Sequence, residues 1–297
     1  MTKIVKLQSK SIMLYVTKNF LHFLPLVVLS TLMLTFFLPP FGPIQFFNRL
    51  FELVSNNPKV VFDDFHESIY QFFSFVSVGL EDFYGINAIW LWIITLIVAL
   101  IGMCMMFSFV ERHIKYGTRR YERLLFALNE TFLSVVPFTL LVVVFYEIWV
   151  LLLSGLIVLA SVLFSGMTFY VISVVLTVVF YIVFFILLSL SLLTPPCMFF
   201  DGYKFGSAIG YSFQLVNVHF KEMVSTVLLN VAISMTLFAI YNFLTDLVTN
   251  PTVWMVMYYV GRFLFYLWWM IFLPCISCCK YVDYTETTRA DLKLKIF

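Results

Sequence analysis

Two charged side chains, Glu147 and Arg262, lie deep within long apolar stretches of the chain. An isolated charge near the middle of a bilayer is costly, so such residues usually pair or line a wet cavity. We therefore expect Glu147 and Arg262 to face the interior of a helix bundle and to interact. Such a pair would have one of two roles. It would either lock the third and sixth spans together or take part in transport. Further hydrogen bonds at similar depth are expected from Tyr146, Asn242, Tyr258 and Tyr259.

Four cysteines form a second candidate, with Cys197 at the end of one apolar run and Cys275, Cys278 and Cys279 at the end of another. Cys275 and Cys278 have the C-x-x-C spacing of metal and redox sites, and cysteines beside a membrane are also acylated. A zinc site would need a second Cys or His pair at ligand spacing, and the sequence has none. We therefore expect inert interfacial cysteines, with metal binding the less favoured alternative. All five cysteines, Cys104 included, fall on the inner, reducing side of the predicted spans, so we expect no disulfides.

A short basic cluster follows the second apolar run and comprises Arg112, Lys115, Arg119, Arg120 and Arg123. It lies beside a span, where anionic lipid headgroups explain it better than nucleic acid does. The four histidines are dispersed, and the chain has no Walker loop, dinucleotide glycine pattern, nucleophile elbow or H-E-x-x-H motif. We therefore expect no enzymatic activity, no cofactor and no nucleic-acid partner.

The elements that position these residues are membrane helices. Of the 297 residues, 62% are hydrophobic and only 11% are charged, which excludes an ordinary soluble globular protein. Residues 148–200 contain no charge at all, and this run breaks naturally at Ser165 and Gly166. Because a span needs about 20 apolar residues, the sequence predicts one all-α membrane domain over residues 1–297. Its six spans are predicted at 20–41, 87–110, 132–158, 168–194, 223–247 and 252–274.

The charges are sorted by the side of the membrane on which they are predicted to lie. Lysine and arginine cluster before the first span, after the second, after the fourth and after the last. The other connections carry mainly carboxylates, such as Asp63, Glu81 and Asp246. By the positive-inside rule, both termini are expected on the cytoplasmic side of the cytoplasmic membrane.

The segment between the first two spans, residues 42–86, has apolar residues at helical spacing in two stretches. These stretches are expected to form helices that lie in the outer interface, or that pack on the span ends as an outer cap.

The inner segments suggest an internal repeat of three hairpins. Phe20 precedes Pro25 by the same spacing that separates Phe132 from Pro137, and Phe220 precedes a serine at that spacing. Each unit is expected to hold an inner amphipathic helix, over residues 4–18, 116–130 and 203–219, then a span outward and a span back. Repeats of this kind are common in membrane proteins that bind something at the repeat interface.

The segment at residues 195–202, PPCMFFDG, continues through Ala208, Ser212 and the Leu-Val pair at 215–216. It resembles the glycerophosphoryl diester phosphodiesterase membrane-domain-like proteins and their uncharacterised six-span bacterial relatives. In that group a span ends at proline, an acidic-glycine turn follows, and an amphipathic helix leads into the next span. The resemblance covers mainly residues 195–290. It implies no catalysis, since this chain has no carboxylate and histidine cluster to serve a phosphodiesterase.

These observations favour a non-enzymatic membrane module that acts through membrane lipids or a protein partner. The alternative is a small permease or lipid-handling transporter whose path runs between the repeats.

Overall fold

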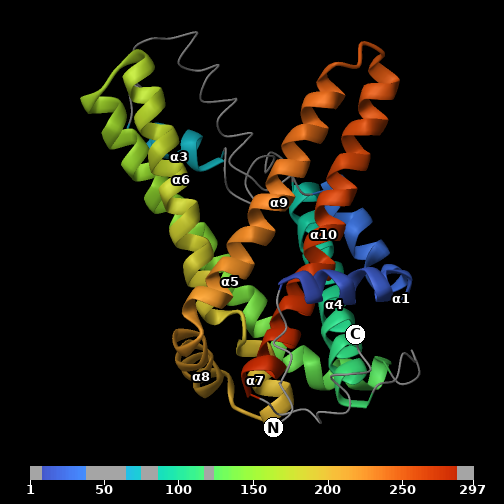
Figure 1. Ribbon diagram of the computed structural model, residues 1–297. Helices are drawn as coiled ribbons and strands as arrows, with labels where there is room; N and C mark the ends of the chain where they lie inside the picture. The colour runs from blue at the N-terminus through green and yellow to red at the C-terminus, as the bar shows by residue number, and fades with distance from the viewer. Residues whose placement is uncertain (1–8, 38–64, 75–85, 117–123, 286–297) are drawn as a thin grey trace.

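The computed structural model describes residues 9–37, 65–74, 86–116 and 124–285, and within these ranges all regular secondary structure is helical (Figure 1). Six helices are long and apolar enough to cross a membrane, which confirms the predicted all-α, multi-pass membrane protein. They are α1 (Ser9–Phe37), α4 (Ile86–Tyr116), α5 (Leu124–Leu163), α6 (Gly166–Ser191), α9 (Phe220–Asp246) and α10 (Pro251–Thr285). The shorter helices are α3 (Phe65–Ser74), α7 (Thr194–Asp201) and α8 (Phe205–Val218).

Two glycines end or begin helices in the left-handed backbone region. Gly166 starts α6 with φ of 58°, and Gly202 follows α7 with φ of 73°. Glycine adopts this conformation without the steric cost that a Cβ would bring. The Gly202 N–H donates to the Met198 carbonyl at 2.9 Å, which caps α7. The predicted break at Ser165 and Gly166 is therefore confirmed.

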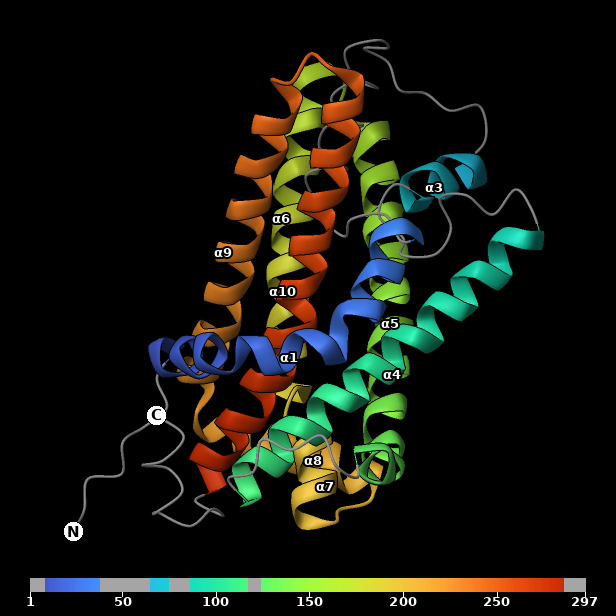
Figure 2. The same ribbon diagram turned by 90° about the vertical axis from the view of Figure 1, so that its right-hand side faces the viewer.

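α1 and α5 each contain one proline, Pro25 and Pro137. Proline lacks the N–H of the helix ladder and clashes with the preceding turn, so it bends a helix. Figure 2 shows that the first part of α1 runs across α9 and α10 before the helix turns upward. In the third unit, α8 and α9 are instead separated at His219. The equivalence of the three units stays a prediction, and residues 4–8 and 117–123 of the expected amphipathic helices lie outside the described residues.

α10 is the most buried of the six candidate spans and packs against α1, α4, α7 and α9. The hairpin of α5 and α6 and the hairpin of α9 and α10 diverge toward one end of the protein (Figure 1). The two hairpins meet where Phe185 of α6 stacks on Trp269 of α10, with ring centroids 6.3 Å apart.

α3 packs on α5, and its buried Phe72 contacts the Phe169 ring of α6 at 6.5 Å between centroids. For this part of the predicted outer segment, the structure therefore shows a helix packed on the spans. Residues 42–64 and 75–85 of that segment lie outside the described residues.

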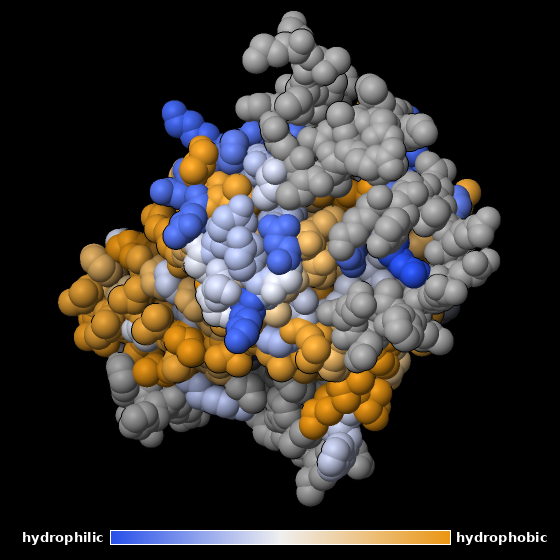
Figure 3. Space-filling model, turned by 90° about the horizontal axis from the view of Figure 1, so that it is seen from below, coloured by the Kyte–Doolittle hydropathy of each residue, from blue (hydrophilic) through white to orange (hydrophobic). Residues whose placement is uncertain are grey.

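Four described basic residues, Arg112, Lys204, Lys221 and Lys280, lie at one end of the bundle, whereas Arg262 lies within α10. The last turns of α4 and α10, the first turns of α9 and the short helices α7 and α8 lie together at this end (Figure 1). Viewed from this end, hydrophilic side chains gather near the middle of the face, with hydrophobic ones to the left of and below them (Figure 3). Asp246 lies at the opposite end, where α9 turns into α10.

Candidate functional site

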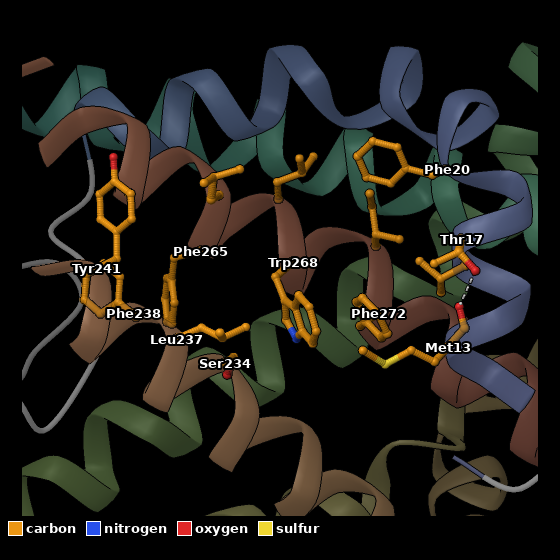
Figure 4. Close-up of a pocket in the computed structure, with 15 residues that line it drawn as sticks. Met13, Thr17, Phe20, Ser234, Leu237, Phe238, Tyr241, Phe265, Trp268 and Phe272 are labelled. Atoms are coloured by element: carbon orange, nitrogen blue, oxygen red, sulfur yellow. Dashed lines mark hydrogen bonds between the residues drawn. The ribbon is translucent and has the colours of Figure 1, made fainter. Parts of the chain in front are cut away.

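An apolar groove of about 630 Å³ lies between α1, α9 and α10 (Figure 4). This volume falls within the range of about 300–1,000 Å³ that is typical of small-molecule pockets. The lining comes from α1 (Met13, Val16, Thr17, Phe20), α9 (Ser234, Leu237, Phe238, Tyr241) and α10 (Gly261, Leu264, Phe265, Leu267, Trp268, Ile271, Phe272).

The groove exists because α1 crosses the other two helices. Figure 4 shows Met13, Thr17 and Phe20 of α1 at one end of the groove and Tyr241 of α9 at the other. The crossing of α1 over α9 and α10 therefore sets the geometry of the site.

An aromatic wall runs along α10. The Trp268 ring stacks on Phe272 with centroids 4.2 Å apart, and Phe265 packs on Phe238 at 4.8 Å. Trp268 Nε1 donates to the Asn230 Oδ1 at 2.9 Å. This hydrogen bond satisfies the only polar atom of the indole and fixes its orientation in an apolar setting.

Gly261 lines the far end of the groove, where α10 lies close to Tyr241 of α9. A Cβ on Gly261 would overlap two ring carbons of Tyr241 and lie 3.5 Å from its Cγ. α9 and α10 therefore approach closely at this level because position 261 carries no side chain.

The rim of the groove faces outward from the bundle. Leu237 and Leu264 both line the groove, and they are 53% and 51% exposed. Both belong to candidate spans, so the groove opens on an apolar, outward-facing surface of the bundle.

A second, smaller cavity of about 40 Å³ lies nearer the start of α9 and the end of α10. Met13 and Phe272 line both cavities. Thr226 and Ile276, which also line the smaller one, each lie one helical turn from a charged residue, Glu222 on α9 and Lys280 on α10.

Glu222, at the start of α9, and Lys280, near the end of α10, form an ion pair. Lys280 Nζ lies 2.7 Å from Glu222 Oε1, and the lysine side chain is fully buried. The same ammonium group lies 5.8 Å from the centroid of the Tyr284 ring, which stacks on His219 at 4.2 Å. The buried ammonium group of Lys280 is thus stabilised by the Glu222 carboxylate and by the face of the Tyr284 ring.

The residues of the expected intramembrane pair lie on different helices, each beside tyrosines. Next to Glu147, Tyr146 of α5 is buried and its hydroxyl lies 3.1 Å from that of Tyr181 of α6. Arg262 is buried on α10, with its guanidinium 5.5 Å from the Tyr258 ring and 5.8 Å from the Tyr259 ring.

These contacts leave the proposed pairing of Glu147 with Arg262 as a prediction. Glu147 belongs to the α5–α6 side of the bundle and interacts electrostatically with Tyr181. Asn242, which was expected at similar depth, lies on α9 and is half-buried.

The cysteines are all buried and reduced. Among the described residues, no three His, Cys, Asp or Glu side chains come together as a set that could hold a metal ion. Cys197, Cys275, Cys278 and Cys279 instead pack within the main apolar core.

Of the expected headgroup cluster, the structure describes Arg112 as half-buried near the end of α4, and Lys115 belongs to the same helix. Arg119, Arg120 and Arg123 lie outside the described residues.

The chain matches no protein-family model, no curated protein and no solved structure. The resemblance of residues 195–290 to the six-span group therefore stays a prediction.

Sequence reasoning missed both the groove and the ion pair that lies beyond it. The sequence does indicate which side of α1 lines the groove, because Met13, Val16, Thr17 and Phe20 recur at helical spacing. Nothing in this spacing tells which helices α1 crosses.

Proposed function

We propose that this protein is a non-enzymatic membrane module that binds membrane lipid, with an acyl chain lying in the groove between α1, α9 and α10. The observation that carries the proposal is the groove itself, which is lined by apolar side chains and open between candidate spans.

The surroundings of the groove favour an acyl chain over a polar solute. A polar ligand would lose its hydrogen bonds to water on entering such a site, and few of the lining side chains could replace them. Thr17 already donates to the Met13 carbonyl at 3.0 Å, and Ser234 to the Val231 carbonyl at 2.9 Å. Their hydroxyl donors are therefore engaged within their own helices.

Binding of this kind gains little from the hydrophobic effect, because the chain leaves one hydrocarbon environment for another. Packing and dispersion supply the free energy instead. The rigid aromatic wall of Phe265, Trp268 and Phe272 suits this role, since its shape is fixed before the lipid arrives.

In the proposed topology, the protein lies in the cytoplasmic membrane with both termini in the cytoplasm. In that topology the end of the groove at Met13 and Phe272 lies toward the cytoplasmic side, and the end at Tyr241 lies toward the outer side. Membrane lipids are the proposed partners.

The test is photo-crosslinking of the full-length protein in lipid bilayers with a phospholipid that carries a diazirine in its acyl chain. Crosslinks should map to the groove segments of α9 and α10. Leu237→Trp places a large ring in the groove and should abolish these crosslinks.

Ile240→Trp is the matched control. Ile240 lies one turn from Leu237 on the same helix and has the same 53% exposure, but it does not line the groove. The I240W protein should crosslink like the wild type. Equal labelling of both variants would contradict lipid binding in the groove.

A further inference from the structure

We infer that the groove selects acyl esters, and that an ester carbonyl oxygen of the bound lipid accepts a hydrogen bond from Asn230 Nδ2 in the smaller cavity. This inference rests on the lipid-binding function proposed above and adds the chemical group by which the lipid is recognised.

Asn230 of α9 is a polar residue in an apolar setting. It is 8% exposed and lines the smaller cavity. The other polar residue of that lining is Thr226, whose hydroxyl donates to the Glu222 carbonyl at 2.8 Å. The amide of Asn230 must therefore find its partners within the protein or on a ligand.

The oxygen of the Asn230 amide is already engaged. Oδ1 accepts a hydrogen bond from Trp268 Nε1 at 2.9 Å. An indole N–H can only donate, so the amide atom that it meets is the oxygen, and this contact fixes the orientation of the amide. Trp268 lines the groove, whereas Asn230 lines the smaller cavity. The amide therefore directs its oxygen to the groove side and leaves Nδ2 on the side of the smaller cavity.

The Nδ2 group of Asn230 has two hydrogens to donate. Within the part of the chain that the structure describes, Asn230 makes no hydrogen bond through Nδ2. A donor left unpaired in an apolar setting costs free energy, which a ligand acceptor would recover. A ligand hydroxyl or ammonium group fits less well, because the side-chain oxygens of Thr226 and Asn230 already take part in hydrogen bonds. The cavity thus favours an acceptor that carries no hydrogen of its own.

Size and position identify this acceptor as the carbonyl of an acyl ester. A water molecule needs about 10–15 Å³ of cavity volume, so the smaller cavity of about 40 Å³ admits a small group but no lipid headgroup. Met13 and Phe272 line both cavities, so the acceptor must be joined directly to the apolar chain in the groove. An ester carbonyl is joined in this way. A charged phosphate would instead lose its hydration, with a neutral amide as its replacement.

The passage between the two cavities lies beside Met13 and Phe272. Phe272 is held by its stack on Trp268 at 4.2 Å, whereas Met13 is 40% exposed. Methionine is unbranched and adapts its shape to its neighbours. The chain can therefore pass Met13 while the ester stays at Asn230.

The experiment compares two phosphatidylcholine probes that carry the same diazirine-bearing chain, one through ester and one through ether linkages, on the full-length protein in bilayers. The ether analogue lacks the carbonyl oxygens and keeps the chain length and the headgroup. Wild-type protein should crosslink the ester probe about fivefold more in the groove segments of α9 and α10, which corresponds to about 1 kcal/mol, the net contribution of a neutral hydrogen bond.

Asn230→Leu removes the donor and keeps a side chain of similar size. The ratio of ester to ether labelling should then fall until the two probes are labelled equally. A loss of folded protein lowers both signals together, so the ratio reports on the contact itself. Asn242→Leu is the matched control, because Asn242 is half-buried on the same helix and lines neither cavity. The N242L protein should keep the wild-type ratio.

Trp268→Phe tests whether the indole positions the amide. This change removes the N–H and keeps a ring that can stack on Phe272. The Asn230 amide can then turn its oxygen toward the cavity, so the ester preference should fall although Asn230 itself is unchanged. A W268F protein with the full wild-type ratio would show that Trp268 does not position the amide.

Phospholipids and neutral glycerides both carry such esters. A third probe, a diacylglycerol with the same diazirine-bearing chain, separates the two sources. The probe that loses labelling in N230L identifies the source, and a loss with neither probe overturns the contact.

The two levels of the proposal fail differently. If L237W removes the labelling of both phosphatidylcholine probes but the wild type takes them equally, the carbonyl contact is wrong and lipid binding stands. If N230L keeps the wild-type ratio, the assignment of Asn230 is wrong. If L237W changes neither probe, the proposed function fails and the carbonyl contact fails with it.

Discussion

Lys280 and Glu222 join the end of α10 to the start of α9 through an ion pair of 2.7 Å, although they are 58 residues apart in sequence. The lysine is fully buried, while the glutamate is 31% exposed. The pair is therefore asymmetric, because the cation depends on the carboxylate far more than the carboxylate depends on the cation.

We expect Glu222→Gln to destabilise the protein more than Lys280→Met does. The first change leaves a buried ammonium without its counter-ion, and breaking a buried pair in this way costs about 3–5 kcal/mol. The second leaves a carboxylate that water can still reach, so its cost should be smaller. Thermal unfolding of the purified protein in detergent measures both. The double variant should be no less stable than E222Q alone, and strictly additive losses would contradict the pairing.

We expect Gly102→Ala to destabilise the contact between α1 and α4. A Cβ at position 102 would overlap the Ser30 Oγ and lie 2.8 Å from the Ser30 Cβ. Overpacking of this kind costs about 1–3 kcal/mol. Thermal unfolding should show the loss, and the added change Ser30→Gly should recover part of it by removing both clashing atoms.

Gly155→Ala serves as the control for that substitution. A Cβ at position 155 of α5 meets no atom within 4 Å. Because alanine favours a helix over glycine by about 1 kcal/mol, this variant should be at least as stable as the wild type. A loss equal to that of G102A would show that glycine is needed for another reason than close packing.

The predicted interaction of Glu147 with Arg262 is open to a double-mutant cycle. If the two side chains pair, Glu147→Leu alone should cost about 3 kcal/mol, and adding Arg262→Leu should restore much of the stability. Thermal unfolding of the two single variants and the double variant gives the coupling. Additive effects would mean that Arg262 is stabilised by its contacts with Tyr258 and Tyr259 instead.

The proposed topology predicts opposite labelling of two exposed positions. Cells that express Lys204→Cys should react with a membrane-impermeant maleimide only after the cytoplasmic side is opened, whereas Asp246→Cys should react in intact cells. The native cysteines are all buried, so their background reaction should be low. Labelling of position 204 in intact cells would reverse the orientation.

The sequence alone determined the number of spans and several of their boundaries. A spanning helix must satisfy its own backbone and present apolar side chains over its whole length, so each span is a local property of about 20 residues. Ser165 and Gly166 mark the turn between α5 and α6 for an equally local reason, since Gly166 takes a backbone conformation that other residues avoid.

Only the tertiary structure decided where the groove lies and which side chains line it. The groove needs the crossing of α1 over α9 and α10, the close approach of Gly261 to Tyr241, and the hydrogen bond from Trp268 to Asn230. Each joins residues that are distant in sequence and otherwise ordinary for a membrane helix. Apolar periodicity shows which side chains face inward, but in a bundle of similarly apolar helices it cannot choose their neighbours. That choice depends on the bends, crossing angles and shapes that emerge when the helices pack together.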